Sequence, residues 1–174
     1  GFPADCFRHV LADHEATGLL LDDRRVAGVS LTGSSEVGRA VMARAAATLK
    51  TCVLELGGSD PFIVLADADL DRAVAGAVTG RLLNTGQSCI AAKRFLVEQP
   101  VYDEFVQKFA GAMAARLVSD PLDADTQVGA IVNQQELDNL RAQIDDATTR
   151  GARLVCGGRR LDRPGLFLEA TVLA

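Results

Sequence analysis

The chain has 174 residues, enough for one ordinary domain or for parts of two. Hydrophobic residues make up 48% and charged residues 24%, a balance typical of soluble globular proteins. With 18 basic against 23 acidic residues, the net charge of −5 favours neither nucleic acid nor an anionic membrane as a partner. No apolar run approaches the roughly 20 residues that a membrane-spanning helix needs.

The four cysteines are widely spread, and none forms a C-x-x-C pair. This spacing predicts free thiols in the cytoplasm, with neither disulfides nor a metal site. We interpret Cys6, Cys52 and Cys156 as packing residues, since free cysteines behave as small hydrophobes. Because the chain begins without methionine and ends on an apolar run, we expect it to be a piece of a longer protein.

The first third of the chain predicts a strand–helix–strand unit. Residues 1–25 are mixed and predict no element, whereas a buried strand is expected over 26–32, a helix over 39–49 and a second strand over 51–56. Such units are normally parallel and right-handed. Ser34 or Ser35 could cap the helix. The Gly-Ser turn before it fits phosphate binding at a helix start, and it equally fits a plain connection.

The glycine-rich stretch 57–61 interrupts this pattern and predicts a domain boundary. Beyond it the alternation of strands and helices indicates an α/β fold with a mostly parallel sheet. The expected elements are strands over 62–66, 94–97 and 152–156 and helices over 70–82, 102–117 and 137–147, with Asp69 capping the first of these helices and Gly151 ending the last.

Two residues carry the chemistry that the sequence suggests. Cys89 lies in Gly-Gln-Ser-Cys-Ile-Ala-Ala, on a connection between a helix and a strand, where a ligand could reach its thiol. Glu55 is a carboxylate within an apolar strand, so it must face solvent, a partner or a functional cleft. Together they suggest a covalent intermediate on sulfur, resolved by a water that the carboxylate activates. The alternatives are a buried structural cysteine and a glutamate at a sheet edge.

Three motifs occur in a specific order: Leu-Thr-Gly-Ser-x-x-x-Gly at residues 31–38, Leu-Glu-Leu-Gly-Gly at 54–58 and Asn-x-Gly-Gln-x-Cys at 84–89. In order and spacing they closely resemble the aldehyde dehydrogenase superfamily, and the resemblance runs over essentially the whole chain. Residues 56–64, 91–95 and 156–158 are similar to those of bacterial succinate-semialdehyde dehydrogenases, which are often NADP-dependent.

The resemblance implies oxidation of an aldehyde to a carboxylic acid with NADP or NAD. Cys89 matches the nucleophile and Glu55 the general base. Gly33, Ser34 and Gly38 match the turn that binds the cofactor pyrophosphate, and Leu56 matches a backbone contact to the nicotinamide. Residues 1–57 would then be the C-terminal half of a Rossmann-like cofactor domain and 58–174 an incomplete α/β catalytic domain.

The resemblance also implies a small-molecule aldehyde as the substrate and a homodimer or homotetramer as the intact enzyme. Because several family segments are absent, we expect residues 1–174 alone to be inactive. Three alternatives stay open at this point: a dehydrogenase for another aldehyde, a CoA-acylating relative and a non-catalytic structural relic.

Overall fold

The computed structural model describes all 174 residues. Contacts within the chain divide it into two compact units, Gly1–Gly57 and Gly58–Ala174. No helix in either unit has both the length and the apolar character needed to cross a membrane.

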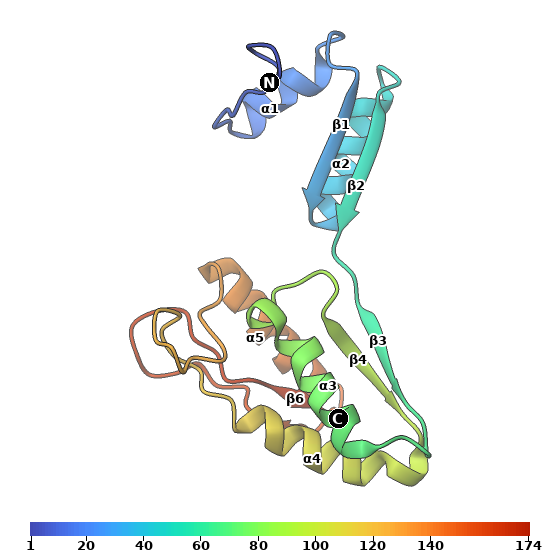
Figure 1. Cartoon of the computed structure of the whole chain (residues 1–174), viewed down its shortest axis with the longest axis vertical. Helices are drawn as coiled ribbons and strands as arrows, with labels where there is room; N and C mark the ends of the chain where they lie inside the picture. Colours follow the sequence, from blue (N-terminus) through green and yellow to red (C-terminus); the bar gives the residue numbers. More distant parts are fainter. The chain divides into compact units, whose positions relative to one another are not determined.

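The first unit is built on two parallel strands joined by a helix. Strand β1 (Gly28–Gly33) pairs with β2 (Thr51–Leu56) in register from Gly28 opposite Thr51 to Gly33 opposite Leu56. Helix α2 (Ser35–Ala46) connects them and lies along one face of the pair (Figure 1). The predicted strand–helix–strand unit is therefore confirmed, although α2 begins four residues earlier than expected.

The helix α1 (His14–Asp22) was not predicted. Asp13 caps it by accepting a hydrogen bond from the Ala16 N–H at 2.8 Å. Its last residue, Asp22, pairs with Arg44 of α2, and this contact lowers the pKa of the Asp22 carboxyl. The buried Lys50 donates to the carbonyls of Asp23 and Val26, each at 2.8 Å, so its charge is hydrogen-bonded.

The second unit contains a parallel pair packed on two helices and a small antiparallel pair. Strand β3 (Asp60–Val64) runs parallel to β4 (Ala92–Val97), whereas β5 (Leu154–Cys156) runs antiparallel to β6 (Val172–Leu173). The helices are α3 (Leu70–Leu82), α4 (Tyr102–Ala114) and α5 (Gln134–Thr149), with 3-10 turns at Leu83–Gly86 and Gln99–Val101. The α/β prediction is confirmed, and the unpredicted strand is β6.

The caps predicted from the sequence are present in this unit. Asp69 caps α3 by accepting from the Arg72 N–H at 3.1 Å. Gly151 follows α5 with a φ of +101°, a conformation that side chains other than glycine rarely adopt.

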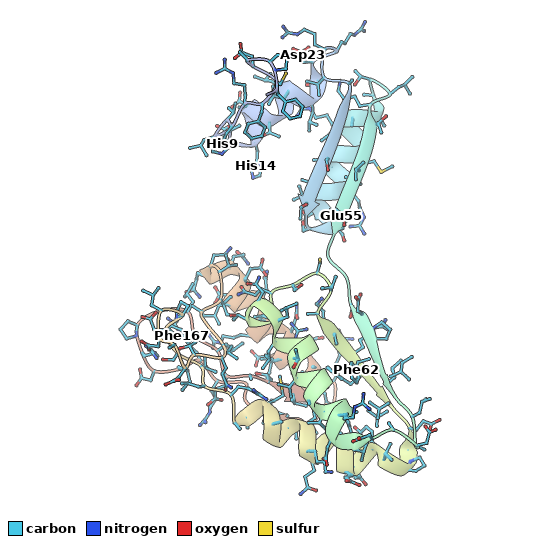
Figure 2. All side chains as sticks on the ribbon, in the orientation of Figure 1. His9, His14, Asp23, Glu55, Phe62 and Phe167 are labelled. Carbon is cyan, nitrogen blue, oxygen red and sulfur yellow. The ribbon has the colours of Figure 1, made fainter.

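The core of the second unit lies between the β3–β4 pair and helices α3 and α4. Its buried members are Val64, Val74, Ala77, Val78, Phe105, Phe109 and Met113. Phe95 and Phe109 bring their ring centroids to 4.7 Å, and Phe62 on β3 packs against the same cluster (Figure 2). This packing fixes α3 relative to β4, the two elements between which Cys89 lies.

Truncating a core aromatic side chain should reduce the stability of this unit. Phe105 is only 1% exposed, so Phe105→Ala should cost about 3–5 kcal/mol in the free energy of unfolding, measured by urea titration. Phe2 is 95% exposed, and the matched variant Phe2→Ala should change stability little. Equal losses in the two variants would contradict this assignment of the core.

Candidate active site

Cys89 lies on the segment that joins α3 and its 3-10 turn to β4, and its side chain is exposed. We call residues 86–92 the thiol loop. The predicted loop position and accessibility of this cysteine are confirmed. A small molecule can reach a thiol in such a position, whereas it cannot reach a thiol packed in a core.

The turn that leads into the thiol loop has an unusual backbone. Asn84 and Thr85 both have positive φ, at 51° and 61°. A β-branched residue in this region is an outlier, and such conformations cost about 1–3 kcal/mol each and cluster at functional sites. The Asn84 side-chain amide donates to the Gln87 carbonyl at 3.3 Å, which closes the turn.

Two side chains anchor this turn and loop to the distant segment 129–132. The Thr85 hydroxyl accepts from the Gly129 N–H at 3.0 Å. The Gln87 side-chain amide donates to the Ala130 carbonyl at 3.3 Å and accepts from the Val132 N–H at 2.9 Å. These contacts could not be predicted from the sequence, because their backbone partners are more than 40 residues away and have no side-chain signature.

The other three cysteines lie in different surroundings. Cys52 and Cys156 are half-buried, as expected for packing residues, and burial raises the pKa of the Cys156 thiol. Cys156 lines a hollow of about 600 Å³ beside the end of α4. The interpretation of Cys6 as a packing residue is wrong. Its side chain is exposed, because the segment before α1 forms no helix or strand that could cover it.

Glu55 lies near the C-terminal end of β2, opposite Thr32 of β1 (Figure 2). Burial alternates along β2, so that Cys52, Leu54 and Leu56 are half-buried whereas Glu55 is exposed. The alternation places Glu55 on the face away from these apolar side chains. Glu55 belongs to the first unit and Cys89 to the second, and their pairing stays a prediction.

The Gly-Ser turn joins β1 to the N-terminus of α2. Gly33 ends the strand, and Ser34 caps the helix by accepting from the Val37 N–H at 3.2 Å, so the cap prediction is confirmed for Ser34. The Gly38 N–H makes the first intrahelical bond, to the Ser34 carbonyl. The N–H groups of Ser35 and Glu36 therefore stay open to an anion, which fits a pyrophosphate held at a helix start.

Gly38 lets α2 pack closely on β2. A Cβ atom at this position would lie 2.7 Å from Cδ2 of Leu56 and 3.0 Å from Cδ1. Glycine at this position leaves room for Leu56 in the conformation that its side chain adopts. Gly33, Ser34, Gly38 and Leu56 thus form one contiguous arrangement at the carboxyl end of the β1–β2 pair. In open α/β sheets, ligands bind at this end.

The titratable side chains of the chain form no cluster suited to a metal. No group of three or more His, Cys, Asp or Glu side chains is placed to hold an ion.

Comparison with known families gives a match to the aldehyde dehydrogenase family over residues 1–174. The chain belongs to this family. It is 53% identical over 173 residues to succinate-semialdehyde dehydrogenase 1 of Mycobacterium tuberculosis, whose name gives NADP(+) as its cofactor. Identity to the corresponding enzyme of Mycobacterium leprae is 51% over 173 residues. Both alignments cover 99% of this chain and 38% of the relative, so the chain spans 38% of the length of these relatives.

Solved structures of aldehyde dehydrogenases agree with the fold. Succinate-semialdehyde dehydrogenase from Burkholderia pseudomallei superposes with a TM-score of 0.90 at 40% identity, covering 95% of this chain and 34% of that one. Lactaldehyde dehydrogenase from Escherichia coli gives a TM-score of 0.90 at 36% identity, covering 94% of this chain and 35% of that one. Dehydrogenases named for two different aldehydes therefore share this architecture.

The close contact at Gly38 can be tested with a matched glycine in another helix. Gly111 in α4 has no atom within 4 Å of an added Cβ, so Gly111→Ala should stabilise its helix by about 0.5–1 kcal/mol. In Gly38→Ala the same gain is opposed by overpacking against Leu56, which typically costs about 1–3 kcal/mol. Urea unfolding should find Gly38→Ala the less stable of the two, and the reverse order would contradict the packing described.

Proposed function

We propose that the chain carries the nucleophile and the general base of an NADP- or NAD-dependent aldehyde dehydrogenase, with succinate semialdehyde as the substrate. The observation that carries the proposal is the exposed Cys89 on an anchored loop that follows a strained turn, within an aldehyde dehydrogenase chain. In this proposal Gly1–Gly57 belongs to the cofactor domain and Gly58–Ala174 to the catalytic domain. The names of the mycobacterial relatives favour succinate semialdehyde and NADP.

The first chemical role falls to Cys89. Its thiolate adds to the aldehyde carbon, which forms a carbon–sulfur bond and turns the carbonyl oxygen into the oxyanion of a thiohemiacetal. Backbone N–H groups aimed at such an oxygen lower the barrier, typically by a few kcal/mol. Loss of hydride from the same carbon re-forms the carbonyl and leaves an acyl group on Cys89 as a thioester.

The second role falls to Glu55. As a general base it takes a proton from water while the water oxygen attacks the thioester carbon. The carbon–sulfur bond then breaks, the carboxylic acid leaves and Cys89 returns as a thiolate. A side chain in this role typically contributes about 10²- to 10⁴-fold to the rate. Its exposure on β2 leaves the carboxylate accessible to water.

The cofactor would be held by Gly33, Ser34 and the start of α2. The open N–H groups and the helix dipole suit a pyrophosphate, while Gly38 lets the Leu56 side chain pack directly against the first turns of α2. When bound, the nicotinamide supplies the acceptor for the hydride.

A second candidate is a dehydrogenase for another aldehyde. Leu83 directly precedes the Asn-x-Gly-Gln segment that leads to Cys89, and its side chain is apolar and 51% exposed. This position, six residues before the proposed nucleophile, therefore offers no charge that could pair with the carboxylate of a semialdehyde. The similarity to lactaldehyde dehydrogenase points in the same direction. Turnover of the intact enzyme with a panel of aldehydes and both cofactors separates the two, and added CoA tests for acyl-CoA in place of free acid.

The surroundings of the intact enzyme follow from the same interpretation. All four thiols of the chain are free, which suits a reducing compartment such as the cytoplasm. We infer a homodimer or homotetramer that acts on a small-molecule aldehyde and binds neither nucleic acid nor membrane.

The two proposed roles predict different kinetic defects in the intact enzyme. Cys89→Ser should lower kcat by at least about 1,000-fold and abolish the first turnover of NAD(P)H. Glu55→Gln should keep a single-turnover burst of NAD(P)H while steady-state turnover falls about 10²- to 10⁴-fold, because deacylation is blocked. The controls Cys6→Ser and Glu15→Gln should behave as the unmodified enzyme. Full turnover in Cys89→Ser would refute the proposal.

A further inference from the structure

The backbone carbonyls of the thiol loop are held by two cationic side chains from the elements on either side. Arg81, at the end of α3, donates to the carbonyls of Gly86 and, at 3.0 Å, Ala92. Lys93, in β4, donates from Nζ to the carbonyls of Ser88, Cys89 and Ala91, each at 3.3 Å. Arg81 thus binds the two ends of the loop and Lys93 its middle.

Neither cation is engaged by a carboxylate. Arg81 and Lys93 take part in no ion pair, so the carbonyls of the loop are their acceptors. Hydrogen bonds from a charged donor are roughly twice as strong as neutral ones. Arg81 is half-buried, and burial lowers the pKa of its guanidinium, yet arginine keeps its charge in proteins.

Gly86 is required for the close approach of Arg81. Its φ is +74°, and an added Cβ would lie 2.8 Å from Nη2 of Arg81. Gly86, the glycine of the Asn-x-Gly-Gln segment, therefore allows both the positive φ of the turn and the close contact with Arg81.

Holding a carbonyl oxygen also fixes the N–H of the same peptide group. The peptide group is planar, and in its trans form the C=O and the following N–H point in opposite directions. Lys93 holds the carbonyls of Ser88 and Cys89, so the N–H groups of Cys89 and Ile90 are directed away from it. Neither N–H donates to an acceptor within the chain. Lys93 thus lies on the carbonyl side of these two peptide groups, opposite their open N–H donors.

We propose that Arg81 and Lys93 are positioning residues, which orient the peptide groups of the thiol loop so that the Cys89 N–H faces the substrate oxygen. This inference rests on the proposed function of Cys89 as the nucleophile. The hydrogen bonds of both side chains go to backbone carbonyls, so the two residues act through the backbone that they hold.

The test uses Arg81→Met and Lys93→Met in the intact enzyme, with Arg72→Met as the matched control. Arg72 is exposed on α3 and its side chain contacts no loop carbonyl. In the two test variants, single-turnover NAD(P)H formation should slow by about 10- to 100-fold, as expected for a misplaced catalytic group. The KM for the cofactor should not change, and iodoacetamide should still label Cys89. Arg81→Lys and Lys93→Arg should recover part of the rate.

Other outcomes would overturn the inference. If both test variants turn over like Arg72→Met, the loop does not need the two cations. If the rate falls only together with thermal stability, and the conservative variants recover nothing, the role is structural. Lys93 is exposed, so Lys93→Met is expected to fold even where Arg81→Met does not. Full turnover in Cys89→Ser would instead refute the proposed function itself, whatever the Arg81 and Lys93 variants do.

Discussion

The fixed conformation of the thiol loop is the constraint on which the proposed chemistry depends. A nucleophile on a mobile connection would present its sulfur and its N–H in many orientations, and few of these would be productive. Here the loop is held on its carbonyl side by Arg81 and Lys93 and through Gln87 by the backbone of residues 130–132. The aromatic core beneath α3 and β4 fixes the two elements from which these contacts start.

The strained backbone before the loop fits the same account. Asn84 and Thr85 adopt left-handed conformations that the chain would avoid in isolation. Two hydrogen bonds offset part of the free energy that these conformations cost: the Gly129 N–H donates to the Thr85 hydroxyl, and the Asn84 side chain closes the turn. The unfavourable backbone conformation thus lies directly before the loop that carries Cys89, the side chain whose direction matters for the proposed reaction. Cys52 and Cys156 lie in ordinary half-buried positions.

In the first unit, two nearby residues determine the structure of the start of α2. In the proposed function its helix start has to remain open to an anion while α2 stays close to β2. Ser34 satisfies the Val37 N–H and leaves the N–H groups of the first turn exposed. Gly38 removes the side chain that would otherwise push Leu56 away. A cap and a small residue, four positions apart, are sufficient for both requirements.

Local patterns explain which parts of this structure the sequence could predict. Apolar periodicity and capping residues predicted β2, α3 and the end of α5, and a thiol between a helix and a strand predicted an exposed Cys89. The helix α1 was missed because its Asp13 cap lies in a mixed, polar segment, and the two-residue β6 exists only through its pairing with β5.

The contacts that hold the thiol loop could not be predicted from the sequence. Their acceptors are backbone carbonyls, which every residue carries and no side-chain pattern marks. From the sequence alone, Arg81 is a cation in the last turn of a helix and Lys93 is a polar residue beside a strand, and neither position indicates a contact with the loop. Only the folded backbone shows that both reach the same loop.

In the proposed reaction Cys89 carries the acyl group during turnover. The most direct measurement is mass spectrometry of the intact enzyme, quenched in acid during turnover of succinate semialdehyde and digested without reduction. The peptide containing Cys89 should gain the mass of one succinyl group, and this adduct should disappear when NAD(P)+ is left out. An adduct on another residue, or turnover with no covalent adduct on Cys89, would contradict it.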